Sequence, residues 1–252
     1  MRAIRESEDM PKAQTKPSGR ILINRDLLPS RGRYYQNDLY ARKLSAIEMK
    51  ELSKVTKLTV DRVFNYVISS AVTGIDLADI KRNDKLWLIY YLRSITYNDF
   101  PMKVKGICPK CKKEAWYDYK LSNLIVVYAE EELQPEVDLP NGDKLEVSFP
   151  TIGDEIDIAK IKNDPSYIET IDVDMMTVAS HIKKINDSSV SLYEAYEYFV
   201  RGKGSAMDYA RLITHLKKYA FGAKAKASFE CSCGNTAYAD VPLTTDFFLP
   251  EI

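Results

Sequence analysis

The sequence predicts an α+β fold with a mainly helical domain, a zinc-ribbon-like β module split by a helical insertion, and an extended N-terminal arm. Apolar residues recur with helical spacing in several segments, and strand-like alternation surrounds two turns that contain cysteines. These two turns lie about 120 residues apart, so a long segment must be inserted between them. The predicted organisation is an arm over 1–43, a helical segment over 44–101, a β module over 102–150 and 223–252, and an inserted helical subdomain over 151–222.

The composition limits the classes of function. The chain has 252 residues, of which 45% are hydrophobic and 29% charged, as in ordinary soluble globular proteins. Its 36 Lys and Arg residues balance its 36 Asp and Glu residues, which argues against a protein whose main task is to coat nucleic acid. No apolar run approaches the ~18 residues needed to cross a membrane, and the N-terminus lacks the apolar core of a secretory signal. We therefore expect a protein that works in a cytoplasm or in an assembly built there.

The first 43 residues are predicted to form an arm. Residues 1–20 are polar, contain two prolines and show no period, which is typical of a disordered segment. An apolar strip over 21–28 then ends in the Pro29–Gly32 turn. The arm carries ten Lys and Arg residues against five Asp and Glu residues; a solvated tail is favoured over a specific phosphate-binding arm.

Helical signals follow the arm and return in the second half of the chain. Helices are predicted over 45–55, 59–72, 85–97, 154–162, 172–185, 191–201 and 205–220. The segment 59–72 has the clearest apolar stripe, and Gly74 ends it. Asp84 is expected to cap the helix over 85–97, which is apolar on nearly every side and is therefore expected to be central to a core or an interface. The helices over 191–201 and 205–220 open with Ser-x-x-Glu and Ser-x-x-Asp capping signals.

The period changes to that of strands around the cysteines. Strands are predicted over 103–107, 114–120, 123–129, 144–149, 226–230 and 236–240. The Asn141-Gly142 pair is expected to form a hairpin turn.

The cysteines give the strongest functional signal. Cys108 and Cys111 form a C-x-x-C turn between two strands, and Cys231 and Cys233 form a C-x-C-G turn between two others. Two such turns can place four thiolates tetrahedrally around one zinc ion, as in a zinc ribbon. A closed set of four thiolates leaves no open coordination position, so the zinc is expected to be structural.

Three other interpretations of the cysteines are less favoured. They could be independent buried thiols, although two close pairs in hairpin turns argue against this. They could form disulfides, but nothing in the sequence indicates an oxidising compartment. The Cys108–Cys111 motif also resembles a thioredoxin-type dithiol, which should open a helix, whereas the residues from Trp116 to Tyr119 continue as a strand.

Other chemistry-bearing motifs fail on inspection. The 202–205 stretch, Gly-Lys-Gly-Ser, lacks the spacing of a phosphate loop and is expected to be a turn between helices. His181 and His215 lack metal-ligand spacing and are expected to be surface or edge residues, while Asp172 and Asp174 are expected to be helix caps. No active site is predicted, so we expect a protein that is not an enzyme and has no small-molecule substrate.

Several patches resemble a known family. The "LPSRGRYY" stretch at 28–35 with "ARKLS" at 41–45 looks like the arm of phage tail baseplate proteins. The "DKLWLIYYLRSITYND" stretch at 84–99, the cysteine turns, "LPNG" at 139–142 and "FPT" at 149–151 resemble the T-even bacteriophage baseplate hub and hub-assembly family. The resemblance implies a non-enzymatic component or assembly factor of a contractile-tail baseplate. Its partners would be other baseplate or tail hub subunits, and its location the host cytoplasm during assembly or the tail baseplate of the virion.

The runner-up is a zinc-ribbon protein that binds nucleic acid, such as a transcription-associated factor. Lysines do cluster around the first cysteine turn, but Glu114, Asp118, Glu230 and Asp240 dilute them. On the favoured interpretation, residues 21–35 and the Tyr-rich helices are expected to dock on neighbouring subunits. The alternative is that the apolar strip packs on its own domain.

Overall fold

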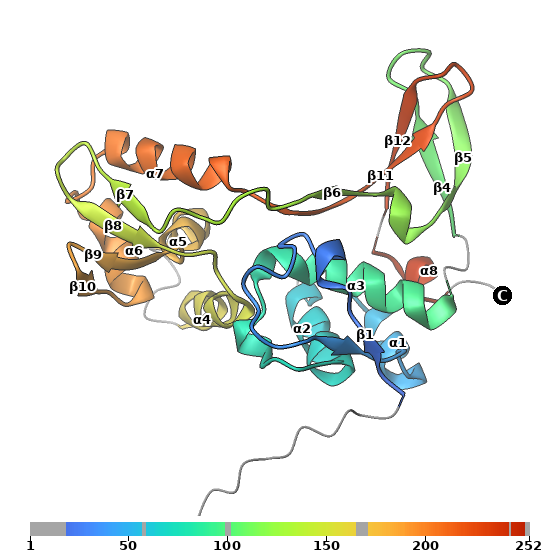
Figure 1. Ribbon diagram of the computed structural model, residues 1–252, viewed down its shortest axis with the longest axis horizontal. Helices are drawn as coiled ribbons and strands as arrows, with labels where there is room; N and C mark the ends of the chain where they lie inside the picture. Colours follow the sequence, from blue (N-terminus) through green and yellow to red (C-terminus); the bar gives the residue numbers. More distant parts are fainter. Residues whose placement is uncertain (1–18, 57–58, 99–101, 165–170, 242, 250–252) are drawn as a thin grey trace, which may run out of the picture.

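The computed structural model describes residues 19–56, 59–98, 102–164, 171–241 and 243–249. Figure 1 shows three parts: a platform of helices, a ribbon that projects from it, and a lobe on the other side of the platform. Extended segments that include β6 (Leu124–Val127) and β11 (Gly222–Glu230) run between the lobe and the ribbon (Figure 1). Residues 1–18, for which we predict disorder, lie outside the described residues.

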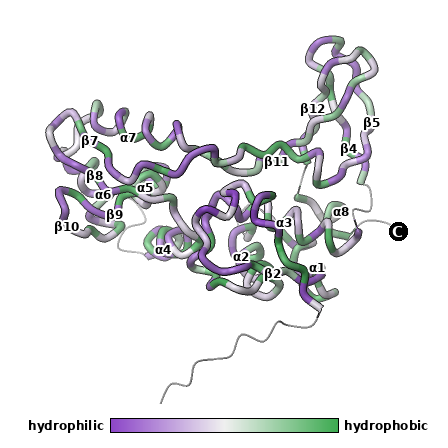
Figure 2. Tube along the Cα trace, viewed as in Figure 1, coloured by the Kyte–Doolittle hydropathy of each residue, from purple (hydrophilic) through white to green (hydrophobic). Residues whose placement is uncertain are grey.

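The platform contains the first helices of the chain and a small sheet. Its helices are α1 (Ala46–Leu52), α2 (Val60–Ala71), α3 (Arg82–Tyr97) and α8 (Thr245–Phe248), and its antiparallel sheet has the order β1 (Ile21–Leu22), β2 (Tyr40–Ala41) and β3 (Val72–Thr73). The predicted capping box opens α1, because Ser45 accepts from the backbone N–H of Glu48 and the Glu48 carboxylate accepts from that of Ser45. Asn98 ends α3 in the left-handed conformation. Figure 2 shows hydrophobic segments gathered around α2, α3 and β2.

The ribbon is part of a five-stranded antiparallel sheet. In the order β5-β4-β12-β11-β6, its strands are β5 (Glu114–Tyr119), β4 (Met102–Ile107), β12 (Thr236–Asp240), β11 (Gly222–Glu230) and β6 (Leu124–Val127). Its inner face shares one core with the platform: Val104, Ala227 and Phe229 are buried in the same cluster as Tyr90 of α3. The Tyr90 hydroxyl donates a hydrogen bond of 2.8 Å to the carbonyl of Val241. The ribbon is thus anchored at its base to α3.

The lobe has a core of its own around a second antiparallel sheet. In the order β10-β9-β8-β7, its strands are β10 (Ser188–Ser189), β9 (Ile182–Ile185), β8 (Lys144–Val147) and β7 (Glu136–Asp138). Its helices are α4 (Ile152–Asn163), α5 (Val173–Ala179), α6 (Leu192–Val200) and α7 (Ala206–Lys218). Capping boxes at Ser191 and Ser205 open α6 and α7 as the sequence predicts.

The prediction of a mainly helical fold with a purely helical insertion is wrong. The structure is 40% helix and 24% strand, with antiparallel sheets of three, four and five strands, which makes it α+β throughout. The helix predicted over 172–185 ends at Ala179, and β9 follows it. Asn186 and Asp187 both have positive φ, at 49° and 64°, the geometry of a tight hairpin turn between β9 and β10. β7 and β8, placed in the ribbon module by the sequence, pair instead with each other and with β9.

The apolar strip of the arm is divided between core and surface. Ile23, Leu28 and Tyr35 are buried in the platform core, with 1%, 0% and 5% of their surface exposed. Ile21 and Leu22 are 41% and 54% exposed. Two of the five apolar residues of the strip, Ile23 and Leu28, therefore pack on their own domain and are closed to any other subunit.

Candidate metal centre

The topology brings the two cysteine turns to the same end of the ribbon. Cys108 and Cys111 lie between β4 and β5, and Cys231 and Cys233 lie between β11 and β12. β4 and β12 are neighbours in the sheet, where Ile107 pairs with Tyr238. Because these strands are antiparallel, the end of β4 and the start of β12 lie at the same end of the sheet, so the two turns meet (Figure 1). All four sulfur atoms lie within 4.8 Å of one another.

The distances between the sulfurs are those of ligands around one ion. The Sγ atoms of Cys108 and Cys233 are 3.6 Å apart, those of Cys111 and Cys231 are 3.7 Å apart, and those of Cys231 and Cys233 are 3.6 Å apart. A tetrahedral site with metal–sulfur bonds of ~2.3 Å separates its sulfurs by ~3.8 Å. The four cysteines predicted from the sequence thus come together, and they could hold a metal ion.

Backbone hydrogen bonds shape each turn. In the first, the N–H of Lys112 donates to the carbonyl of Cys108 at 2.9 Å, and Lys112 has a φ of 60°. In the second, the N–H of Gly234 donates to the carbonyl of Cys231 at 2.8 Å, with a φ of 76° at Gly234. Glycine adopts this left-handed conformation without steric cost, which explains the C-x-C-G pattern.

The turns also aim N–H groups at the sulfurs. The backbone N–H of Asn235 and then its side-chain amide lower the pKa of Cys233 to about 6. The N–H of Cys111 lowers the pKa of Cys108. At Cys111 the N–H of Lys113 acts in the same direction, but burial and the three neighbouring sulfurs outweigh it and raise the pKa to about 11. A cation bound among these sulfurs would favour the charged form of every one of them.

The surroundings of the cluster differ on its two sides. Cys108 and Cys231 are buried beside Ala237, whereas Cys111 and Cys233 are exposed. The ring of Tyr117 stacks on Phe229 with 4.7 Å between centroids. Burial, the charge on Cys231 and a hydrogen bond with that residue raise the pKa of Tyr117. The buried cysteines thus pack against Tyr117 on the inner face of the ribbon.

The other predicted residues lie elsewhere. His181 is half-buried, and its Nδ1 bonds the carbonyls of Thr177 and Val178, both at 3.2 Å. His215 bonds the carbonyl of Gln134 through Nε2 at 2.8 Å. Neither histidine belongs to the sulfur cluster.

Of the two aspartates predicted to be helix caps, one has that position. Asp172 caps α5 by accepting from the N–H groups of Asp174 and Met175, whereas Asp174 lies inside the first turn and does not cap the helix as predicted. Gly202, with a φ of 85°, lies in the turn between α6 and α7.

Asp84 has a role that the sequence did not reveal. Helix α3 begins at Arg82, so Asp84 lies inside its first turn and does not cap it as predicted. Its fully buried carboxylate accepts from the N–H of Ser30 at 2.9 Å and from the Tyr35 hydroxyl at 2.6 Å. Burial raises the pKa of Asp84. This carboxylate fastens the arm to α3, and only the three-dimensional contact shows it.

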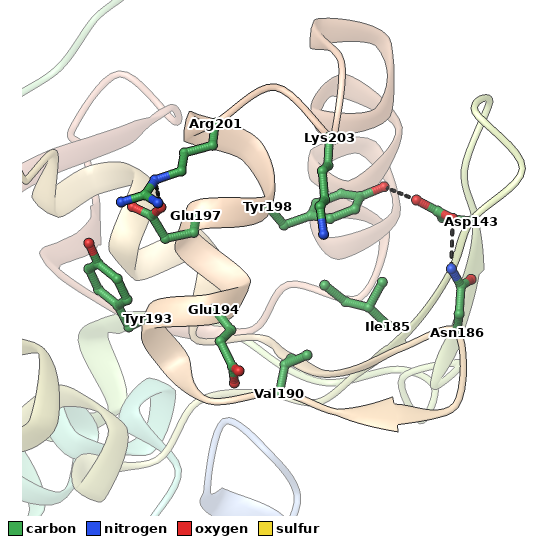
Figure 3. A pocket seen from close by; sticks show the side chains of 10 residues that line it. All are labelled: Asp143, Ile185, Asn186, Val190, Tyr193, Glu194, Glu197, Tyr198, Arg201 and Lys203. Carbon is green, nitrogen blue, oxygen red and sulfur yellow. Dashed lines mark hydrogen bonds and ion pairs between the residues drawn. The ribbon is translucent and has the colours of Figure 1, made fainter.

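An open groove of about 670 Å³ lies in the lobe. Figure 3 shows Asp143 on one side, held by Asn186 and Tyr198, and the Glu197–Arg201 ion pair on the other. The amide of Asn186 and then the hydroxyl of Tyr198 lower the pKa of Asp143. The carboxylates of Asp143 and Glu197 are thus already bound to side chains of the lobe, which gives them a structural role.

Comparisons with known proteins add no relative. No family model, no curated protein and no solved structure matches the chain. Within the described residues, no helix combines the length and the apolar character that a membrane span needs.

Proposed function

We propose that the protein is a non-enzymatic structural or assembly component of a contractile phage tail baseplate, acting at the hub, with one structural zinc ion. The cluster of Cys108, Cys111, Cys231 and Cys233 is the observation that carries the zinc. Its all-sulfur donor set and its separations of 3.6–3.7 Å suit a tetrahedral ion of borderline softness. The ion would have no open position for substrate or water, so its work would be to hold the ribbon rigid.

The arrangement of the family-like patches supports the baseplate part of the proposal. Ser30 and Tyr35 from the first patch bond Asp84 from the second. Tyr34 of the first patch contacts Phe149 of a third, with ring centroids 5.7 Å apart, and Lys81 donates to the carbonyl of Phe149 at 3.0 Å. Patches that are far apart in the sequence thus form one packed junction. A shared junction is what a family pattern would preserve.

Exposed apolar residues near the start of the described arm are the proposed contact with other hub subunits. Leu22 and Leu27 are 54% and 47% exposed on the platform, next to buried Ile23. Exposed leucines on a rigid support are suited to a protein interface.

Two ion pairs on the sheet of the ribbon favour a protein partner over nucleic acid for that surface. Lys105 is paired with Glu114, and Lys226 lies 3.8 Å from Asp240. Lysines that are already neutralised release few counterions from phosphates, so they contribute little to nucleic-acid affinity.

Co-expression tests the baseplate assignment. The protein is co-expressed with the products of the genes that neighbour its own, and complexes are isolated by size exclusion. We expect tail and baseplate genes among these neighbours and a stable complex with at least one baseplate subunit. Leu22→Asp with Leu27→Asp should abolish the complex, whereas the control Met207→Asp, 69% exposed on α7, should not. Neighbouring genes without tail proteins, or no complex with any of them, would contradict the proposal.

A further inference from the structure

The outer face of the ribbon carries exposed apolar side chains on a rigid support. Trp116, Ile107 and Tyr238 are 65%, 49% and 46% exposed. All three point away from the inner face, where Val104, Ala237 and Ala239 are buried. The four cysteines lie at one end of these strands, where the proposed zinc would hold them, and α3 holds them at the other. A tryptophan exposed on such a sheet is typical of an interface hot spot.

The strand register places these side chains in two rows across the sheet. Directly paired residues of antiparallel strands lie on the same face. From β5 to β11 the first row is Glu114, Ile107, Tyr238 and Ser228. Continuing the same register, the second row is Trp116, Lys105, Asp240 and Lys226. In the second row the charges of Lys105, Asp240 and Lys226 alternate in sign, beginning next to Trp116.

This pattern is complementary to itself. Consider a two-fold axis that runs parallel to the strands, between β4 and β12. Each row then faces the same row of a second copy in reversed order, so that β4 faces β12 and β5 faces β11. Ile107 then meets Tyr238 of the other copy, and Lys105 meets Asp240. Further from the axis, Trp116 meets Lys226, a cation–π pair, and Glu114 meets Ser228. No like charges face each other in this arrangement.

We propose that this face binds a second copy of the chain, sheet on sheet, to form a two-fold symmetric dimer. Packed sheets are rotated by about 30°, and contacts next to the axis are displaced least by this rotation. Ile107–Tyr238 and Lys105–Asp240 are therefore the contacts that define the dimer. Because four strands span only ~20 Å, the interface falls below the usual size of a stable one, and we expect reversible dimers at micromolar or weaker affinity.

The two other candidate occupants are less suited to the face. Single-stranded nucleic acid stacks on exposed aromatic residues, but it also needs unpaired cations along its backbone. Lys105 and Lys226 each have an acidic neighbour, Glu114 and Asp240. A different protein would have to present a matching row of alternating charges, whereas a second copy of this chain already has one.

Sedimentation velocity of the zinc-loaded full chain tests the proposal, from about 5 to about 500 µM, the range expected for interfaces of this size. Wild type should pass from monomer to dimer within this range. Trp116→Ser should weaken association at least about tenfold, while the control Met207→Ser, equally exposed but on α7, should leave it unchanged. Zinc content and melting temperature verify that each variant is folded. A wild-type monomer throughout, or an unchanged Trp116→Ser dimer, overturns the proposal.

Charge exchange tests the arrangement itself. Lys105→Glu and Asp240→Lys should each be monomeric, because each places like charges across the axis. Mixed together they should associate, since the carboxylate introduced in one variant then faces the ammonium group introduced in the other. Failure of the mixture to associate overturns the two-fold geometry. Saturable binding of a labelled single-stranded oligonucleotide that Trp116→Ser abolishes would assign the face to nucleic acid instead. None of these outcomes depends on the baseplate assignment.

Discussion

Cys231→Ser removes one of the two buried ligands of the proposed zinc ion and should destabilise much more than the turn around it. The proposed zinc ion would link Cys111 to Cys231, a separation of 120 residues (231 minus 111). In the chain-entropy treatment, a cross-link over a loop of this length stabilises the fold by about 5 kcal/mol. For a chain of this size each kcal/mol shifts the melting temperature by roughly 2–4 °C. We therefore expect the variant to melt about 10–20 °C below the wild type.

The loss should reach the platform, because the ribbon and the platform share a core. Tyr119 on the inner face of β5 lies 6.2 Å from the rings of both Tyr90 and Phe247. Loosening the strands removes packing from α3, so hydrogen exchange should quicken there as well as in β4 and β12. The core of the lobe, which is separate, should change less.

Calorimetry, elemental analysis and hydrogen exchange on the purified protein provide the measurements. Wild type should contain one zinc per chain, and a chelator should lower its melting temperature as the substitution does. Ser232→Ala is the matched control, because Ser232 lies between two ligands but only accepts an exposed hydrogen bond of 3.3 Å from Lys113. The reasoning is refuted if Cys231→Ser keeps stoichiometric zinc, or if it loses the metal and melts within about 2 °C of wild type.

Three further substitutions test the electrostatics. Burial raises the pKa of Glu48, but hydrogen bonds from Arg42 and its other partners outweigh this and lower the pKa to about 2. The ionised Glu48 should therefore contribute about 3 kcal/mol to the free energy of unfolding above pH 4.5, and this contribution should disappear as the pH falls through 2. Acid titration of Glu48→Gln should not show this loss. Burial lowers the pKa of His181 to about 4, so stability should decline as pH falls from about 6.5 to 4, and unfolding curves of His181→Phe should not show that decline. Asp84→Ala leaves the Tyr35 hydroxyl and the buried N–H of Ser30 without an acceptor. The free energy of unfolding in urea should fall by about 2–4 kcal/mol, and trypsin should cleave the arm faster. Unchanged cleavage would show that Asp84 does not hold the arm.

Local signals predicted the parts of the structure that depend on neighbours in sequence. The capping boxes at Ser45, Ser191 and Ser205 and the apolar stripe of α2 are each contained in a few consecutive residues, and each forms as expected. Each cysteine turn is equally local. Because one pair of cysteines supplies only half of a four-sulfur metal site, the meeting of the two turns could be predicted across 120 residues.

The errors arose where short strands depend on distant partners. Residues 182–185 have isoleucines three apart, a spacing compatible with a helix, and only pairing with β8 makes them a strand. The Asn186-Asp187 turn was the available signal, since both residue types tolerate positive φ. The two-residue strands β1, β2 and β3 have no period at all and exist only because they lie side by side. The contact between Asp84 and the arm could not be predicted for the same reason.

Helix α3 connects the arm, the ribbon that carries the four cysteines, and α8 in one mechanical unit. Its first turn holds the arm through Asp84, its middle holds the base of the ribbon through Tyr90, and its last turns hold α8 through Arg93 and Tyr97, which donate to the carbonyls of Phe247 and Phe248 at 2.6 and 2.7 Å. A helix that must fasten elements on several sides is apolar on several sides, which is the feature its sequence shows. The arm presents Leu22 and Leu27 from a platform that shares its core with the ribbon, and the proposed metal would hold the ribbon together at its tip. Zinc bound at the tip of the ribbon would therefore stabilise a contact surface on the opposite side of α3.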